Sequence, residues 1–294
     1  MANAETEYVI RMRDSLAHFD GQLARFIQDH GHEPEPGSIA ANERSTFSDP
    51  ERIITCWALW NYLTELGGEH VSLFCKSLTE PVEVIACFTC VRSMLKSCAI
   101  AAWIADPAID ARTRVGRALA HRYKGMEQQL KFARAVKRPQ PELTKVEAQF
   151  DVLEHDALSL VFSTIVNSKG ERIGVGERML GTTEMIGKVL DEENNYRMLS
   201  ANTHGHFWAI HQLCYRPSDA SPDLMVDSVA AKGFEKELKF EAIALMGSCV
   251  FKSITRPLWN HCHYFGWHAS RLEELIENVA DKLQINNHRR FWRS

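Results

Sequence analysis

The amino-acid sequence predicts an all-α protein, a multi-helix bundle with one continuous core. Apolar residues recur at intervals of three and four positions over most of the chain, as they do on the buried face of a helix. Proline and glycine interrupt this pattern at spacings that suit the helices of a globular protein. The chain has 294 residues, of which 45% are hydrophobic and 24% charged. A chain of this length and composition can enclose a substantial core, and we find no β-rich section.

The first half of the chain shows clear signals for the ends of its helices. A helix is expected over 5–29, and a polar linker with two prolines and two glycines follows over 31–45. Asp49 is suited to the N-cap of the second helix and Pro50 to its first position. We expect this helix to end at the glycine pair 67–68.

The most apolar helix is expected over 81–105, which makes it the predicted centre of the bundle. Arg92 and Lys96 lie one turn apart within it. Because removing a charge from water is costly, these two side chains must be paired or must point into a polar cavity. They also interrupt the apolar run, so no membrane span is expected. A basic helix over 110–136 follows.

The second half of the chain continues the helical pattern. It is expected to contain a helix over 142–166, a glycine-rich loop or short hairpin over 168–181, a short helix from Thr182 or Thr183 to Leu190, helical structure within 193–215, a connection over 216–234, and helices over 235–254 and 257–283. We therefore predict a single domain over 1–294. Within it, an N-terminal helical extension (1–48) and a C-terminal helical pair (235–285) flank a bundle core (about 49–215).

Charge and cysteine usage limit the classes of function. The formal net charge is −4, so the chain as a whole does not attract nucleic acid, and a polyanion would have to bind a local basic patch. The N-terminus lacks the apolar segment of a secretory signal. Eight cysteines lie mostly within apolar helical patterns, which is typical of buried reduced thiols. These features predict a cytoplasmic protein, and we expect no cofactor.

The segment 193–215 carries the densest group of chemically useful residues. Arg197 and His204 are seven positions apart and can project from one face of a helix, with Ser200 between them. Gly205 is suited to end that helix. A histidine can accept the proton of an RNA 2′-hydroxyl while an arginine holds the phosphate. The pair therefore fits metal-independent RNA cleavage.

A purely structural role is the alternative for this pair. In that interpretation Arg197 pairs with a carboxylate such as Glu193, and His204 caps the end of the helix. The two interpretations predict different surroundings, because a catalytic pair needs an open groove beside it.

The spacing from Arg197 to His204 resembles the R-x4–6-H signature of the HEPN superfamily. These helical bundles include metal-independent endoribonucleases of toxin–antitoxin, abortive-infection and CRISPR systems. Met198 follows the arginine, where the nuclease families usually have a polar residue. Over about 85–215 the chain is also similar to a group of bacterial helical proteins of uncharacterised function. That likeness rests on Tyr196, Ser200, His204 with Gly205, and the stretch from Trp103 to Pro107 before an arginine-rich helix.

The resemblance implies a bundle that cleaves RNA without a metal ion. In that role His204 would act as general acid or base, Arg197 would bind the phosphate, and Ser200 would support them by hydrogen bonding. Such sites are commonly completed across a two-fold axis, so the resemblance also implies a homodimer. An antitoxin or another defence protein is the partner it suggests.

The basic helix is a second candidate site. Arg114, Arg117, His121 and Lys124 share one face by spacing, and such a face suits the phosphate backbone of RNA. The alternative is a solvated helix face paired with acidic neighbours.

Histidine spacing offers a third candidate. His204 and His211, like His261 and His268, are seven positions apart, so two helices could present four imidazoles to one metal ion. The Glu-x-x-His form that often completes such sites is absent from the sequence, and we predict no metal. Three functions thus remain open: an RNA-binding or RNA-cleaving protein, a non-catalytic helical interaction protein, and a histidine-bound metal enzyme.

Overall fold

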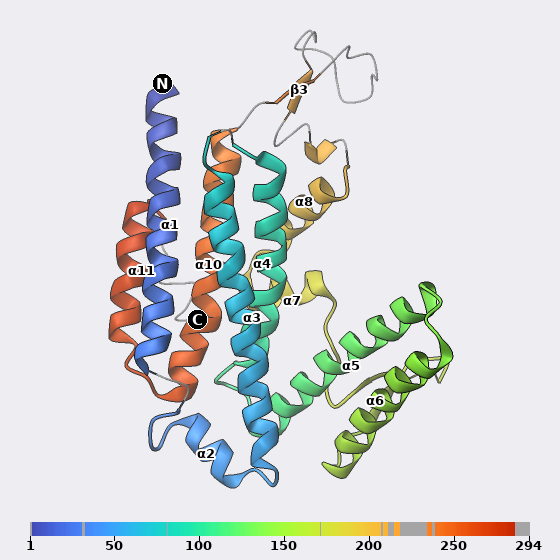
Figure 1. Ribbon diagram of the computed structural model, residues 1–294. Coiled ribbons are helices and arrows are strands. Elements are labelled where there is room, and N and C mark those ends of the chain that lie inside the picture. The colour runs from blue at the N-terminus through green and yellow to red at the C-terminus, as the bar shows by residue number, and fades with distance from the viewer. Residues whose placement is uncertain are drawn as a thin grey trace.

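A computed structural model describes residues 2–30, 33–80, 82–170, 172–206, 208–210, 215–217, 234–236 and 239–285. These residues form a helical bundle around one packed core, which confirms the predicted all-α class (Figure 1). The helices are α1 (Ala2–His30), α2 (Ile39–Thr46), α3 (Pro50–Ser77), α4 (Val84–Ile104), α5 (Ala111–Ala135), α6 (Gln140–Ser159), α7 (Thr182–Leu190), α8 (Glu193–Thr203), α10 (Phe240–Phe265) and α11 (Ser270–Lys282). Two small antiparallel pairs accompany them: β1 (Thr164–Val166) with β2 (Arg172–Val175), and β3 (Tyr215–Pro217) with β4 (Phe234–Lys236).

Helix α4 lies at the centre of the bundle, as its apolar composition predicts. It packs against α3, α10, α7 and α8, and Figure 1 shows it between these neighbours. Val91, Leu95 and Cys98 are completely buried. By length and composition, Ile85–Ile104 could cross a membrane, and most of this stretch is buried inside the bundle. Burial between neighbouring helices accounts for its apolar character.

Helix α3 runs without a break from Pro50 to Ser77, so the predicted end at the glycine pair was wrong. Gly67 serves close packing rather than termination. A Cβ atom at this position would lie 2.5 Å from Sγ of Cys98 on α4. The absence of a side chain lets α3 approach α4 closely, and this packing outweighs glycine's helix-propensity cost of about 1 kcal/mol.

Helix α10 is also longer than predicted, because it continues through Pro257. Proline removes one backbone hydrogen bond and usually breaks a helix. Here Ile254 and Leu258 on either side of it are buried in the core, so tertiary packing holds the helix together. The helix ends at Gly266, which has a φ of 75° and donates its N–H to the carbonyl of Cys262.

Two other boundaries differ from the sequence prediction. The predicted linker at 31–45 contains the start of α2, whose N-cap Ser38 accepts a hydrogen bond from a backbone N–H of the first turn. Helix α6 ends at Ser159 rather than near 166. The β-branched residues after it favour a strand, and Thr164–Val166 pairs with β2. A short hairpin is therefore present, but its first strand lies in the predicted helix rather than within 168–181.

Of the remaining helices, α1 packs into the bundle, whereas α5 and α6 project from it. α1 packs against α11, α3 and α10, and Leu16 and Phe19 place it within the same core as the bundle. Helices α5 and α6 pack on each other and project from the body as an arm (Figure 1). The predicted connection at 216–234 lies mostly outside the described residues, and β3 and β4 pair at its two ends.

The arm is anchored at the start of α5 by Arg114, whose side chain is fully buried. Its Nε donates to Oε2 of Glu43 on α2 at 3.0 Å, and the hydroxyl of Tyr264 on α10 donates to the same oxygen at 2.6 Å. Its terminal nitrogens donate to three backbone carbonyls between residues 104 and 109. The network fixes the direction in which α5 leaves the bundle.

Candidate functional site

Helix α8 ends where the sequence predicted. Gly205 has a φ of 72°, and its N–H donates to the carbonyl of Asn202 at 2.9 Å. The N–H of His206 donates to the carbonyl of Ala201, also at 2.9 Å. These two bonds form the Schellman motif that glycine favours at a helix C-terminus.

The predicted catalytic residues lie on the outer surface of α8. Arg197 is 64% exposed and donates to Oε1 of Glu193 from Nη2 at 2.7 Å and from Nε at 3.0 Å. His204 is the exposed C-cap residue, and its N–H donates to the carbonyl of the half-buried Ser200 at 3.0 Å. None of the three lines any of the five best-formed cavities of the described chain. This is the arrangement of the structural alternative, with Arg197 paired to Glu193 and His204 capping the helix.

The predicted RNA-binding face of α5 is divided among three environments. Arg114 lies in the core and its guanidinium is taken up by Glu43 and backbone carbonyls, so its place in the RNA-binding set was wrong. The spacing did place these residues on one helical stripe, but Glu43 of α2, Trp60 of α3 and Tyr264 of α10 surround the Arg114 side chain. A side chain without exposed surface cannot reach a phosphate.

Arg117, one turn further along, is half-buried. Its guanidinium lies 5.0 Å from the ring centre of Trp103, donates to the carbonyl of that residue, and lies 3.6 Å from a carboxylate oxygen of Asp106. Burial lowers the pKa of Arg117, although an arginine stays charged throughout the physiological range. The residue lines a cavity of about 420 Å³, which we call the Arg117 cavity.

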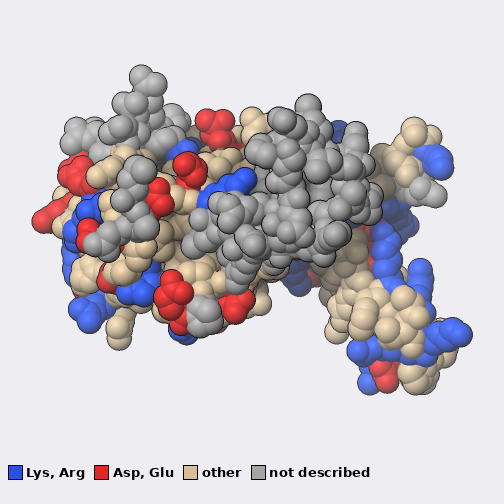
Figure 2. All heavy atoms as spheres, turned by 90° about the horizontal axis from the view of Figure 1, so that it is seen from above, with Lys and Arg blue, Asp and Glu red and all other residues tan. Residues whose placement is uncertain are grey.

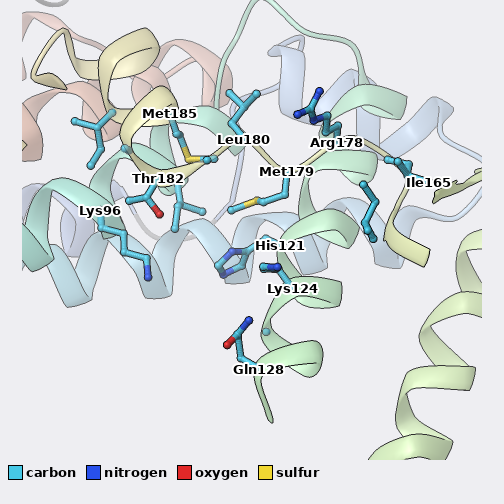
Figure 3. Close-up of a pocket in the computed structure, with 16 residues that line it drawn as sticks. Lys96, His121, Lys124, Gln128, Ile165, Arg178, Met179, Leu180, Thr182 and Met185 are labelled. Carbon is cyan, nitrogen blue, oxygen red and sulfur yellow. The ribbon is translucent and has the colours of Figure 1, made fainter. Parts of the chain in front are cut away.

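His121 and Lys124 line a larger cavity of about 630 Å³, which we call the His121 cavity. It lies between α4, α5, the β1–β2 hairpin and the start of α7. Figure 3 shows Lys96, His121, Lys124 and Gln128 along one edge. The opposite wall is apolar and consists of Ile100, Met179, Leu180, Met185 and Ile186, with Ile165 and Ile173 from the hairpin.

The His121 cavity is electropositive. Lys96 makes no ion pair within the described part of the chain, whereas Lys124 pairs with Glu127 at 2.5 Å. No carboxylate is among the described residues that line the cavity. The first turn of α7 opens onto it at Gly181 and Thr182, and the positive end of a helix dipole favours an anion there.

The imidazole of His121 is neutral near physiological pH. Burial lowers its pKa below the ordinary value of 6.5, and the neighbouring charge of Lys96 lowers it further. Within the described chain the ring makes no hydrogen bond, so both nitrogens are available to a ligand. The cavity therefore combines two ammonium groups with an imidazole that gains a proton when an anion approaches.

The two cavities adjoin each other along α5. Arg178 and Leu180 line both, and in Figure 3 the guanidinium of Arg178 points away from His121. We call the combined surface the α5 groove. Its charged residues are the six cations Lys96, Arg117, Lys124, Arg178, Lys188 and Arg256 and the two carboxylates Asp106 and Glu177. Seen from above in Figure 2, further lysines and arginines gather over the projecting arm.

Sequence reasoning identified part of this groove. Lys96 was expected to be paired or to point into a polar cavity, and it lines the polar edge of the His121 cavity. Arg92, one turn before it, packs over the ring of Tyr196 at 5.7 Å. Arg178 was missed because it lies in an irregular segment, where residue spacing does not predict a shared face.

The histidines considered for a metal site lie in different environments in the described chain. His261 is buried and stacks on Trp267 with 4.5 Å between ring centres, while His268 is exposed. His211 lies outside the described residues. Among those described, no three histidine, cysteine, aspartate or glutamate side chains are placed to hold a metal ion.

The chain was compared with known proteins at three levels. Protein-family models, curated protein sequences and solved structures gave no match. The site is therefore interpreted from its own geometry and chemistry.

Proposed function

We propose that this protein binds RNA, with the phosphate backbone lying along the α5 groove. The observation that carries the proposal is the excess of cations over carboxylates along two adjoining cavities. Lysine and arginine contacts to phosphates supply most of the affinity of proteins for nucleic acid. A local groove of this kind reconciles binding of a polyanion with the chain's overall charge of −4.

The surroundings of the groove support the same proposal. Lys131, Arg134, Lys137 and Arg138 are exposed on the arm beyond Lys124. Lys131 and Arg134 pair with Glu127 and Glu147, which limits their strength as individual contacts. Their summed field still attracts a polyanion toward the arm and raises the rate of encounter.

Binding, rather than cleavage, is the function that the geometry supports best. The α5 groove contains cavities and, at Lys96 and Arg178, cations without an ion pair in the described chain. Arg197, in contrast, is engaged by Glu193 on an exposed helix face. The HEPN-like cleavage chemistry therefore does not enter the proposal.

The direct test is the salt dependence of RNA affinity. A labelled single-stranded RNA of roughly 12 nucleotides is titrated by fluorescence anisotropy at about 50 to 200 mM salt. Lys96→Ala and Arg178→Ala each remove a cation that has no ion-pair partner in the described chain, so neither leaves an orphaned carboxylate. Each is expected to weaken binding several-fold and to reduce the logarithmic salt slope by about 0.7.

Lys76→Ala is the matched control, because Lys76 is an exposed lysine on α3 that lines neither cavity of the α5 groove. Its affinity and salt slope should equal those of the wild type. RNA binding that survives both groove substitutions unchanged would place the interface elsewhere. Failure of the wild type to bind RNA at low salt would refute the proposed function.

A further inference from the structure

The His121 cavity has two chemically different walls. Lys96, His121, Lys124 and Gln128 form a polar edge, and methionine, leucine and isoleucine side chains form the rest. A bare phosphate would use the polar edge and leave the apolar wall in water. Because covering apolar surface is favourable, the lining suits a ligand that joins an anionic group to a flat, weakly polar body.

We propose that the His121 cavity holds one unpaired nucleotide of the bound strand, with its phosphate at Lys96 and His121 and its base against the methionine wall. This inference rests on the proposed function and specifies it, because it predicts that the groove selects single-stranded over duplex RNA. In a duplex the bases are stacked inside, whereas an unpaired base can turn outward into a pocket.

The dimensions and chemistry of the cavity agree with such a ligand. Its volume of about 630 Å³ lies within the range of pockets that enclose small organic molecules. Met179 and Met185 offer polarisable sulfur atoms, which pack well against aromatic rings. Gln128 and Thr182 provide donors and acceptors for the polar edge of a base.

His121 makes phosphate binding sensitive to pH. The charged groups that line the cavity with it are Lys96 from α4, Lys124 from α5 and Arg178 from the segment before α7. All three are positive, and the charge of Lys96 opposes protonation of the ring. A phosphate between Lys96 and His121 would favour the protonated ring, so that binding is accompanied by proton uptake and strengthens as the pH falls.

Two substitutions separate the two halves of the proposed subsite. Gly125 lies on α5 and lines the cavity, and a Cβ atom there would meet no atom within 4 Å. Gly125→Leu therefore improves helix propensity while its side chain takes up ligand space. Gly21→Leu, at an equally open position on α1, is the matched control. Lys96→Ala removes charge at the polar edge and leaves the apolar wall intact.

The experiment measures binding of adenosine 5′-monophosphate, adenosine and inorganic phosphate by calorimetry, beside binding of single-stranded and duplex RNA by anisotropy. The wild type should bind the monophosphate at least about tenfold more tightly than either part alone and should prefer the single strand. Gly125→Leu should lose the monophosphate and Gly21→Leu should retain it. Lys96→Ala should weaken the monophosphate without affecting adenosine.

The outcomes distinguish the nucleotide subsite from the proposed RNA binding by the α5 groove. RNA binding without preference for the monophosphate, or full monophosphate binding by Gly125→Leu, would overturn the nucleotide subsite and leave the RNA groove standing. Equal affinity for single-stranded and duplex RNA would also overturn it. Absence of RNA binding by the wild type would remove both.

Discussion

Replacing Arg114 by methionine tests whether this arginine stabilises the fold rather than binding RNA as the sequence predicted. The substitution keeps a long unbranched side chain but removes the charge and five N–H donors. Glu43, itself only 8% exposed, would stay buried, and Tyr264 would be its remaining hydrogen-bond donor in the described chain. Three backbone carbonyls between residues 104 and 109 would also lose the hydrogen bond from the guanidinium.

The structure sets the expected size of the effect. Removing one partner of a buried ion pair costs about 3–5 kcal/mol, because the other charge remains desolvated. The lost carbonyl contacts belong to the same network and do not add independently. We expect Arg114→Met to lower the free energy of unfolding by about 3–5 kcal/mol, a large share of the roughly 5–15 kcal/mol typical of a domain.

The assay is urea unfolding followed by circular dichroism. Arg134→Met is the control, because Arg134 is on the same helix and pairs with Glu147 at 3.0 Å, with both side chains well exposed. An exposed pair contributes at most about 1 kcal/mol. Combining Arg114→Met with Glu43→Gln should cost less than the sum of the single substitutions, since the second change removes the orphaned charge.

Two results would refute this reasoning. A loss no larger than that of Arg134→Met would show that the buried network contributes no more than a surface pair. Weaker RNA binding by Arg114→Met under conditions where it is fully folded, with an unchanged α5 groove, would return Arg114 to the RNA-binding residues.

Three further predictions follow from other parts of the structure. Burial and the charge of Lys96 lower the pKa of His121, so the unfolded chain binds the proton more readily and wild-type stability should fall as the pH drops below about 6.5. Urea unfolding at pH values of about 7.5 and 5.5 should show a smaller fall in stability for His121→Gln than for the wild type. An equal fall would contradict the lowered pKa of His121. Gly67→Ala should destabilise the fold by about 1–3 kcal/mol, because the new methyl group would overlap with Cys98 on α4. Gly21→Ala should stabilise the fold by about 0.5–1 kcal/mol through its higher helix propensity. Thermal melts compare the two variants. Arg197→Ala and His204→Ala should leave RNA binding unchanged. When the wild type and the two variants are incubated with labelled RNA in EDTA, no cleavage should depend on either residue. Cleavage by the wild type that both folded variants lose would instead establish the HEPN-like mechanism.

The features of the fold that the sequence predicted well are those carried by local pattern. The apolar run around Leu95 marked α4 as the centre of the bundle, and Asp110 marked the start of α5, where its side chain accepts the N–H of Thr113 at 2.7 Å. Gly205 marked the end of α8. Each of these signals depends on residues within one or two turns of each other, so no knowledge of tertiary packing was needed.

The errors occurred where a distant contact overrides a local signal. Gly67 is a helix breaker by propensity, but Cys98 on another helix makes its missing side chain an advantage. Pro257 is a breaker too, and the buried residues beside it hold α10 together. Arg114 belongs to a basic stripe, and only the arrangement of α2 and α10 shows that this part of the stripe faces inward.

Lys96 shows how a local inconsistency in an amino-acid sequence can indicate a site. An ammonium group in the middle of the most apolar helix opposes burial of that helix, and a leucine would serve better there if only packing mattered. Its neighbours Leu95 and Ser97 are buried, while its own side chain reaches the His121 cavity. Arg197 and His204 break no such rule, because an arginine paired at i−4 and a polar residue at a helix C-terminus are both favourable on an exposed helix. In this chain the spacing of a known motif is therefore weaker evidence for a functional site than a charged residue at a position where the fold gains nothing from it. Lys96→Leu tests this conclusion, because it should preserve or raise the melting temperature while weakening RNA binding. A loss of stability without a loss of RNA binding would reverse the conclusion.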